Sequence, residues 1–313
     1  MSVSTAYGGG VWSPRLASMR DDMAEAWGEW GVSSECGRLH AVLLRRPGPE
    51  LDAIEDFDAV QMRAGLDPDL ARRQHDALAA AYRACGVEVY YVERGRIDKP
   101  NSMFVRDLML MTPEGAIVTR PASTVRAGEE RLVAEALARA GVPILMTVHG
   151  GGTFEGADVA WVDRDLCFLA EGLRTNEEGA NQVERMLREI GVRDVVRVGL
   201  PYGAMHLDGL LSLVDRDLAV VWPRRTPFKV VQTLRARGFR FIEVEDEAET
   251  QACLPMNGVA VAPGEIVVPA GGTTMLARYA EAGVVCHVVE VGELIKAGGG
   301  IHCMTGFLKR DDL

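Results

Sequence analysis

The sequence lacks the features that mark secreted and membrane-spanning proteins. No apolar run approaches the length of a membrane-spanning helix, and the first residues, MSVSTAYGGGVW, lack a basic segment followed by an apolar one. No two cysteines form a Cys-x-x-Cys pair, which in a chain of 313 residues is typical of reduced thiols in the cytosol. We therefore expect a soluble, cytoplasmic protein. The six widely spaced cysteines are Cys36, Cys85, Cys167, Cys253, Cys286 and Cys303.

The chain is also short of positive charge. Its 34 Lys and Arg residues stand against 45 Asp and Glu residues, which gives a net charge of −11. This balance argues against a nucleic-acid partner and against an anionic membrane surface, and it is compatible with a cationic small-molecule substrate. Hydrophobic residues at 48% and charged residues at 25% are ordinary for a globular protein with a full core. The composition leaves open whether the protein forms a homo-oligomer.

A strand, a helix, a glycine and a second strand recur along the chain. Each expected helix ends at a glycine suited to the left-handed position that follows a helix. These glycines are Gly86, Gly141, Gly191, Gly238 and Gly283, with spacings of 55, 50, 47 and 45 residues. A period of about 50 residues indicates repeated supersecondary units.

Most units carry an additional strand ahead of this set, so that each unit is predicted to be β-β-α-β. The expected additional strands are 108–111, 159–162, 210–214 and 258–262. The first unit lacks this leading strand, whereas residues 304–309 near the C-terminus form a strand candidate without a partner. Pairing the two would close a ring of five units and leave few exposed sheet edges.

We therefore predict an α/β fold, a five-bladed α/β propeller of ββαβ units whose ring is closed by the C-terminal strand. Residues 1–313 are expected to form a single domain, in which residues 1–37 are an N-terminal tail and a helix. Ser13-Pro14 predicts the start of that helix, because Pro is favoured at the first helical position. The alternative for the same pattern is an open α/β sheet with right-handed crossovers.

Polar residues recur at one topological position, the loop before the first strand of each unit. In a closed ring these loops converge on one central channel. A solvated loop explains any one carboxylate, but it does not explain why a cysteine, a histidine and several carboxylates occupy equivalent positions. The residues are Asp107, Glu155 and Asp158, His206 and Asp208, Asn257, and His302 with Cys303.

Cys303 follows three glycines, 298–300, and precedes a small-residue segment. This composition suits a thiol held on a flexible turn, close to something that must approach it. The alternative is a buried structural cysteine, but the position of Cys303 on the strand that would close the ring favours a nucleophile. Alternation along that strand would point His302 away from Cys303. His149 and His287 belong to no motif and are interpreted as structural.

The chemistry available to such a set is narrow. Asp107 and Asp208, if they face one ligand, require a cation between them, and a planar guanidinium donates to two carboxylates at once. A bound cation would lower the pKa of the Cys303 thiol and favour attack by the thiolate. His206 can protonate a departing amine and then take a proton from water, with Glu155 orienting the imidazole.

A metal site is the alternative use of His206 and Asp208. The sequence lacks the further His and Asp clusters that a two-metal site requires. We therefore expect neither a metal nor an organic cofactor.

At these residues the chain resembles the guanidine-modifying superfamily, or pentein fold, which includes arginine deiminases, dimethylarginine dimethylaminohydrolases and amidinotransferases. The resemblance covers nearly all of residues 38–309. FVRD ending at Asp107 is similar to the deiminase FTRD, and FEGAD ending at Asp158 to its EGGD. HLD at 206–208 is similar to the HxD of deiminases and amidinotransferases. GGIHCMT at 299–305 lies between the deiminase GGGPRCMS and the amidinotransferase GGSFHCWT.

The resemblance implies a role for each of these residues. Cys303 is implied as the nucleophile, with His206 and Glu155 as its catalytic partners, and Asp107 and Asp208 as guanidinium-binding residues.

Two arginines are implied as ligands of a substrate α-carboxylate. RTNEEG, which begins at Arg174, is similar to the RTNxxG of dimethylaminohydrolases, where the arginine holds that carboxylate. Arg126 is a weaker match to a second such arginine. The alternative for both is a surface arginine at the start of a helix.

Departures from the family pattern bear on the substrate. Asn101, a candidate substrate-binding residue, lies where dimethylaminohydrolases carry an aspartate, which argues against specificity for methylated arginine. Ala157 replaces a usual glycine and would either narrow the pocket or have no effect. Glu155 favours a hydrolase, because amidinotransferases generally have Asp there, whereas the pair His302-Cys303 is closer to the amidinotransferases.

The resemblance thus implies a catalytic domain that hydrolyses a guanidino carbon–nitrogen bond of arginine or an N-substituted arginine. The path would pass through a thiouronium intermediate on Cys303 and would yield citrulline with ammonia or an alkylamine. The alternatives are an amidinotransferase acting on an amine acceptor, a dihydrolase that gives ornithine, and a non-catalytic binding protein of the same fold. A pure binding protein would have no reason to keep Cys303, His206 and Glu155 together.

Overall fold

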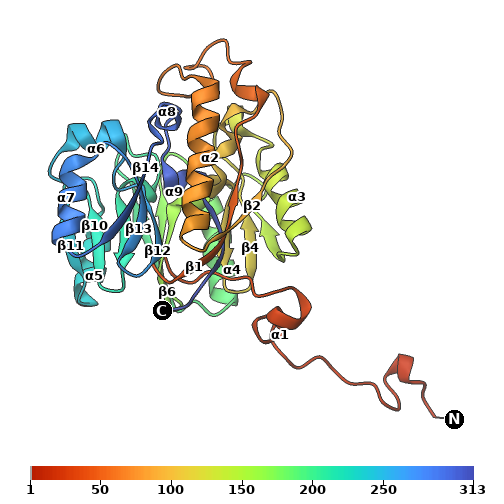
Figure 1. Ribbon diagram of the computed structural model, residues 1–313. Helices are drawn as coiled ribbons and strands as arrows, with labels where there is room; N and C mark the ends of the chain where they lie inside the picture. The colour runs from red at the N-terminus through yellow and green to blue at the C-terminus, as the bar shows by residue number, and fades with distance from the viewer. Residues whose placement is uncertain (1) are drawn as a thin grey trace.

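Five three-stranded sheets, one for each predicted unit, make up the computed structural model, which describes residues 2–313. In every sheet the central strand pairs antiparallel with one neighbour and parallel with the other. A helix connects each parallel pair. Helices α2, α3, α5 and α7 lie on the outside of the body, and α9 lies near its centre (Figure 1). The prediction of an α/β propeller built from five ββαβ units is confirmed.

The bounds of the units follow the chain. The first contains β15 (Gly306–Arg310), β1 (Leu39–Leu44), α2 (Pro68–Ala84) and β2 (Glu88–Tyr91). The second contains β3 (Met109–Thr112), β4 (Gly115–Val118), α3 (Glu130–Ala140) and β5 (Ile144–Thr147). The third contains β6 (Val159–Asp163), β7 (Leu166–Glu171), α4 (Glu177–Glu189) and β8 (Asp194–Gly199). The fourth contains β9 (Leu211–Asp215), β10 (Leu218–Val221), α5 (Phe228–Ala236) and β11 (Arg240–Glu243). The fifth contains β12 (Val259–Ala262), β13 (Glu265–Pro269), α7 (Thr273–Glu281) and β14 (Val285–Val289).

Short helical turns precede the first strands of several units, where the sequence places the candidate site residues. Three are 3-10 turns: η4 (Val105–Leu108), η6 (Gly156–Asp158) and η7 (Leu207–Gly209). The remaining α-helices are α1 (Met19–Ala26), α6 (Glu247–Cys253), α8 (Gly292–Ile295) and α9 (Ile301–Met304), and the other 3-10 turns are η1 (Thr5–Tyr7), η2 (Pro49–Leu51), η3 (Pro100–Met103) and η5 (Thr124–Arg126). Cys303 therefore lies on the helical turn α9, and the expectation that it lies on the final strand is wrong.

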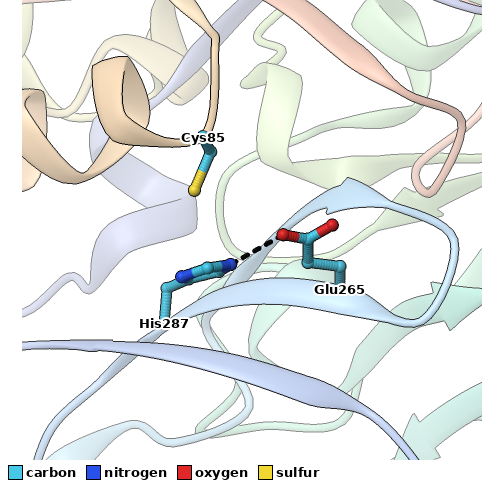
Figure 2. A group of neighbouring side chains, drawn as sticks. All are labelled: Cys85, Glu265 and His287. Carbon is cyan, nitrogen blue, oxygen red and sulfur yellow. Dashed lines mark hydrogen bonds and ion pairs between the residues drawn. The ribbon is translucent and has the colours of Figure 1, made fainter.

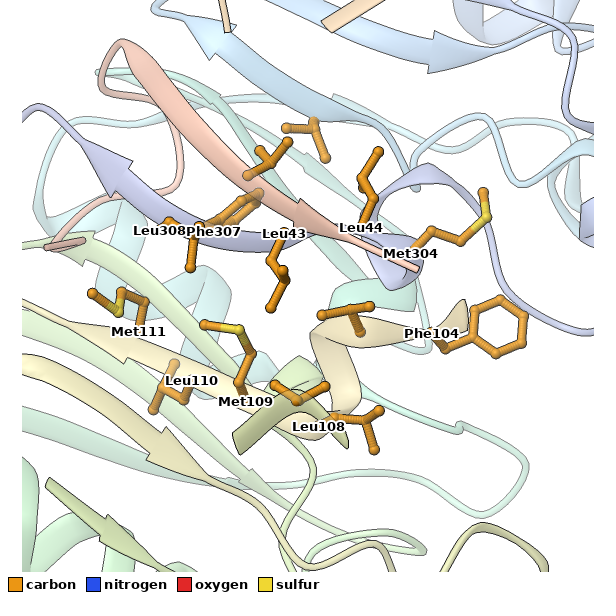
Figure 3. Close-up of a cluster of buried hydrophobic side chains, with 14 of the residues drawn as sticks. Leu43, Leu44, Phe104, Leu108, Met109, Leu110, Met111, Met304, Phe307 and Leu308 are labelled. Carbon is orange, nitrogen blue, oxygen red and sulfur yellow. The ribbon is translucent and has the colours of Figure 1, made fainter. Parts of the chain in front are cut away.

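The two ends of the chain meet in the first sheet. β15 pairs antiparallel with β1, and β1 pairs parallel with β2. Figure 3 shows β1 and β15 packed against β3, with Leu43, Met109 and Phe307 in the space between them. Each of these three side chains is only 1% exposed. Burying one such side chain stabilises a fold by roughly 1.5–3 kcal/mol, so this contact fixes β15, and with it α9, against the second unit.

The glycines that end the repeated helices adopt the predicted conformation. Their φ angles are 79°, 79°, 92°, 83° and 81°, in the order of the chain. These values lie in the left-handed region, where a side chain would be strained.

The N-terminal helix begins later than the sequence suggests. Helix α1 starts at Met19, because Ser18 and Asp21 form a reciprocal capping box there. Ser13 and Pro14 instead belong to the exposed segment that projects away from the body in Figure 1. No helix among residues 2–313 combines the length and the apolar character needed to cross a membrane.

Candidate active site

A small cavity opens between the helical turns that precede the strands. Eight residues are implied as catalytic or substrate-binding, and six of them line this cavity: Asn101, Asp107, Arg126, Arg174, His206 and Cys303. Asp208 lines an adjoining hollow that shares Cys303 and His206. The eighth, Glu155, lies directly behind His206. The cavity is lined by Gln61, Asn101, Phe104, Asp107, Arg126, Arg174, Met205, His206, Ala297, Gly298, Gly299 and Cys303.

Cys303 is held in place by side chains from two other units. Its Sγ lies 3.3 Å from Asp208 Oδ2, and Asn257 Nδ2 lies 3.3 Å from the same sulfur. Asn257 Oδ1 also accepts hydrogen bonds from the backbone N–H groups of His302 and Cys303. Burial, together with the charges of Asp208 and Asp107, raises the pKa of the Cys303 thiol well above its ordinary value of 9.0. In the unliganded protein the sulfur is therefore a neutral thiol at neutral pH.

The glycines before Cys303 serve close packing rather than flexibility. A Cβ on Gly299 would lie 2.5 Å from the Phe104 ring, and a Cβ on Gly300 would lie 2.6 Å from Asn257 Oδ1. Side chains at these positions would push α9 away from the residues that hold the sulfur. The flexible turn expected from the glycine run is thus a closely packed segment.

His206 and Glu155 form a buried pair at the wall of the cavity. His206 Nε2 lies 2.7 Å from Glu155 Oε2, and both side chains are almost fully buried. Burial alone would lower the pKa of His206, but the charges of Asp107 and Glu155 outweigh it and raise that pKa to about 10. Burial would raise the pKa of Glu155, but the hydrogen bond and charge of His206 lower it to about 2. The pair is therefore an imidazolium beside a carboxylate at neutral pH.

Asp107 presents one free oxygen to the cavity. Its Oδ2 accepts a hydrogen bond from Arg126 Nη1. Its Oδ1 is buried and has no hydrogen-bond partner among the described residues, although it lies 3.9 Å from His206 Nδ1. A buried carboxylate oxygen without a donor is costly, so this atom suits a donor brought by a ligand.

Asp208 is shared between the nucleophile candidate and a second histidine. His302 Nδ1 lies 2.9 Å from Asp208 Oδ2, and His302 Nε2 lies 3.3 Å from Glu35 Oε2. Burial would raise the pKa of Asp208, but the hydrogen bond and charge of His302 lower it. His302 lines a hollow that excludes Cys303, so its ring does face away from the thiol. The reason is the helical turn, in which successive side chains diverge, and not strand alternation.

Arg126, Arg174 and Asn101 line the cavity but differ in their free donors. Arg126 is bonded to protein groups throughout: Nη1 to Asp107, Nε to Glu129 at 2.8 Å, and Nη2 to backbone carbonyls. Among the described residues, Arg174 makes one side-chain hydrogen bond, from Nη1 to Glu155 Oε1 at 3.3 Å. Asn101 Nδ2 donates to the backbone carbonyl of Val60. Of the two arginines, Arg174 has the donors left for a ligand, and the carboxylate role of Arg126 stays a prediction.

Sequence reasoning assigned no role to several residues at this site. Asn257 lies in the loop before the first strand of the fifth unit, and this position in the repeat indicates its contact with Cys303. Glu35 carried no signal, because it precedes the repeat, yet its carboxylate contacts both His302 and Arg106. Ala157 is buried outside the cavity lining, so it does not narrow the pocket.

Asp107, Glu155 and His206 also satisfy the spacing of a metal site, with ligand atoms within 4.8 Å of one another. The Arg126 guanidinium already lies against both carboxylates, 3.8 Å from Glu155 Oε2. Positive charge in this pocket thus comes from an arginine and an imidazolium of the chain itself. Carboxylates that are already paired with a guanidinium and an imidazole fit a planar organic cation better than a metal ion.

Comparison with known proteins identifies relatives of this chain. The family model described as N,N dimethylarginine dimethylhydrolase, eukaryotic, matches residues 59–309. The N(G),N(G)-dimethylarginine dimethylaminohydrolase of Pseudomonas aeruginosa is 29% identical over 243 residues, which cover 76% of this chain and 89% of the relative. The protein of the same name from Streptomyces coelicolor is 28% identical over 263 residues, which cover 84% of this chain and 95% of the relative.

The fold agrees with solved structures as well. The structure of the Pseudomonas aeruginosa enzyme complexed with citrulline has a TM-score of 0.73 and 25% identity, and the match covers 86% of this chain and 99% of that chain. The expected guanidine-modifying superfamily is confirmed. Because the family model spans most of the sequence, this chain belongs to the dimethylarginine dimethylaminohydrolase family, a group of hydrolases that act on carbon–nitrogen bonds of linear amidines.

Proposed function

We propose that this protein hydrolyses a guanidino carbon–nitrogen bond of arginine or an N-substituted arginine through a covalent intermediate on Cys303. The observation that carries the proposal is the arrangement around one cavity of a half-buried thiol, a buried imidazole paired with a carboxylate, and a carboxylate oxygen without a donor among the described residues. Cys303 and His206 line the cavity together, and the unpaired Oδ1 of Asp107 lies beside them. This is the donor and acceptor pattern that a guanidinium satisfies.

Binding of the substrate cation prepares the nucleophile. Asp107 Oδ1 and the remaining oxygen of Asp208 accept N–H groups of the guanidinium. The positive charge then lies close to Cys303 and offsets the two carboxylates that raise the pKa of its thiol. The thiol loses its proton to solvent, and the thiolate attacks the guanidino carbon. Substrate binding and thiol activation are in this way coupled.

Two proton transfers at His206 complete the reaction. The imidazolium, held at 2.7 Å from Glu155, donates a proton to the departing nitrogen as the carbon–nitrogen bond breaks. A thiouronium remains on Cys303, and the neutral imidazole takes a proton from water as the water oxygen bonds to the same carbon. The carbon–sulfur bond then breaks, the second proton of the water passes to the Cys303 sulfur, and a ureido product leaves with the water oxygen as its carbonyl.

Arg174 supports an amino-acid substrate over a simple guanidine. Its side chain is 10% exposed at the cavity wall, and only one of its nitrogens is bonded to Glu155. The other guanidinium N–H groups can hold the α-carboxylate of arginine. Asn101, where relatives with methylated substrates carry an aspartate, favours unmethylated arginine or a different N-substituent.

Product analysis tests the proposal. The protein is incubated with arginine, methylated arginines, agmatine and guanidinoacetate, with and without glycine or lysine as acceptors, and the products are identified by mass spectrometry. We expect a ureido product with ammonia or an alkylamine, and an amidino adduct on Cys303 after acid quench. An amidinated glycine or lysine would instead indicate transfer to an amine.

A matched pair of cysteine variants provides the control. Cys303→Ser should lose nearly all turnover, whereas Cys286→Ser, which changes a half-buried cysteine on β14, should retain it. If Cys303→Ser turned over as fast as the wild type, the covalent mechanism would be wrong.

A further inference from the structure

A second group of reactive side chains lies outside the candidate active site. Cys85 ends helix α2, Glu265 begins β13, and His287 lies on β14. Figure 2 shows the Cys85 sulfur pointing toward the imidazole of His287, which in turn contacts the carboxylate of Glu265. None of the three lines the cavity that contains Cys303. The group therefore needs an explanation of its own.

The fold brings these residues together from two different units. β13 and β14 are parallel, with Glu265 opposite Val285 and Val267 opposite His287. Glu265 and His287 are thus diagonal neighbours on one face of the sheet. Val267 on that face belongs to the same hydrophobic cluster as the buried residues of α2. Helix α2 contacts β14, and Cys85, the residue that caps its C-terminus, completes the group.

The opposite face of the same sheet provides a contrast. Cys286, adjacent to His287 on β14, packs with Tyr279 of α7 in a separate hydrophobic cluster. Its side chain is directed away from Glu265 and His287, as alternation along a strand requires. Cys85, at the end of α2, thus lies on the same side of the sheet as His287, whereas Cys286, its neighbour in sequence, lies on the other side.

The ligand atoms of the three side chains are close enough to share one ion. Cys85 Sγ, a carboxylate oxygen of Glu265 and a ring nitrogen of His287 all lie within 4.8 Å of one another. His287 Nε2 is 2.7 Å from Glu265 Oε1. Tetrahedral zinc holds such ligands about 3.4–3.6 Å apart, so small side-chain rotations suffice. The side chains of His287 and Glu265 are 39% and 35% exposed, which leaves a path for an ion.

We propose that Cys85, Glu265 and His287 form a binding site for a zinc ion that joins helix α2 of the first unit to the sheet of the fifth. Sulfur, imidazole and carboxylate together are ligands that zinc prefers among the common divalent ions, whereas magnesium and calcium favour oxygen alone. Water from the exposed side supplies the fourth position. The role of the ion is to tie the units whose loops hold Cys303 and Asn257.

Cobalt substitution tests the site without interference from the active-site thiol. In a Cys303→Ser background, Co²⁺ is titrated and the near-ultraviolet thiolate-to-cobalt absorption is recorded. We expect saturation at one equivalent and displacement by Zn²⁺. Adding Cys85→Ser should abolish the absorption, and His287→Gln should weaken binding by at least about tenfold. The Asp107, Glu155 and His206 group contains no thiol, so it cannot produce this signal.

Cys286→Ser in the same background is the matched control and should leave the cobalt absorption unchanged. The proposal would be overturned if the cobalt absorption survived Cys85→Ser, or if the Cys303→Ser protein itself showed no such absorption. A second measurement uses the wild-type protein, with alkylation of each cysteine followed by peptide mass spectrometry. One equivalent of Zn²⁺ should slow the alkylation of Cys85 and leave the alkylation of Cys286 unchanged. Equal alkylation of Cys85 with and without zinc would also overturn it.

Discussion

His302 Nδ1 lies 2.9 Å from Asp208 Oδ2, the same oxygen that lies 3.3 Å from the sulfur of Cys303. Two adjacent residues of α9 therefore contact the same carboxylate oxygen. His302 is itself bonded to Glu35, whose carboxylate is paired with Arg106 at 3.0 Å. Burial would raise the pKa of Glu35, but the charges of Arg106 and His302 lower it to about 2. Positively and negatively charged side chains thus alternate from Arg106 to Asp208, the carboxylate beside the Cys303 sulfur.

Removing His302 should make the Cys303 thiol harder to ionise. Burial would lower the pKa of His302, but its hydrogen bonds to Asp208 and Glu35 raise it, so the fold favours a positively charged ring beside Asp208. In His302→Ala that charge no longer offsets Asp208, and the pH dependence of iodoacetamide alkylation of Cys303 should move upward. The thiolate fraction, and with it kcat at fixed pH, falls about tenfold for each pH unit of this shift.

His149→Ala is the control for this experiment, because His149 is an exposed loop residue. It should leave the alkylation profile unchanged. An unshifted profile in His302→Ala would show that Asp208 does not transmit the charge of His302 to the sulfur.

The thiol of Cys303 should ionise at lower pH with substrate bound than without it. In the free protein, the ultraviolet absorption of the Cys303 thiolate is measured as the difference between wild type and Cys303→Ser. It should appear only above pH 9.0, because burial and two carboxylates disfavour the anion. With saturating substrate the guanidinium offsets those carboxylates, so the rising limb of kcat lies at lower pH. A free-protein thiolate signal with a midpoint below 9.0 would contradict the proposed coupling.

The His206–Glu155 pair should stabilise the fold in a defined pH window. The pKa of His206 is raised from 6.5 to about 10, so its contribution is complete below 6.5 and is lost as the pH rises through 10. The pKa of Glu155 is lowered from 4.5 to about 2, so its contribution is complete above 4.5. Both contributions to stability are therefore complete between pH 4.5 and pH 6.5.

His206→Gln should therefore lose most stability in that window and progressively less toward pH 10, as measured by urea unfolding at a series of pH values. Its kcat should fall by roughly 10²–10⁴-fold, because the general acid is gone. A stability difference that stays constant from pH 6.5 to 10 would mean that the imidazole is neutral in the fold.

Arg174→Ala should separate binding of the amino-acid end from the chemistry. Charge-assisted hydrogen bonds contribute about 1.5–3 kcal/mol, so KM for arginine should rise roughly 10- to 100-fold. Agmatine has no carboxylate, and its KM should change little. This substrate also controls for the lost contact between Arg174 and Glu155. Equal effects on the two substrates would assign Arg174 to positioning Glu155 instead.

Gly156 should tolerate no side chain, unlike its neighbour. A Cβ at this position would lie 2.1 Å from the backbone oxygen of Met109 and 2.5 Å from that of Arg106. Gly156→Ala must therefore displace η6 from η4, and we expect a loss of stability of at least about 1–3 kcal/mol with reduced activity. Ala157→Gly, the matched control, should lose less stability and keep its activity. Urea unfolding of both variants provides the comparison.

The repeat was determined by the sequence itself, because strand and helix periodicity and the glycine after each helix are local properties. The same repeat identified the loop before each first strand as the place for Asp107, Glu155, His206, Asp208 and Cys303. It missed short helices such as α9, since four residues carry no periodic pattern. It also placed the start of α1 at Ser13-Pro14, because Pro at a first turn is a weaker signal than the capping box at Ser18.

Only the tertiary structure decided how those loops meet. The bond between His302 and Asp208 joins residues 94 positions apart, and that between His302 and Glu35 joins residues 267 apart. Such contacts depend on the relative placement of the units, which no local pattern encodes. The bonding of Arg126 to protein groups and the close approach of Gly299 and Gly300 to neighbouring side chains depend on the same placement. The sequence determined which groups reach the cavity, and packing between units decided which of their atoms remain free to bind a ligand.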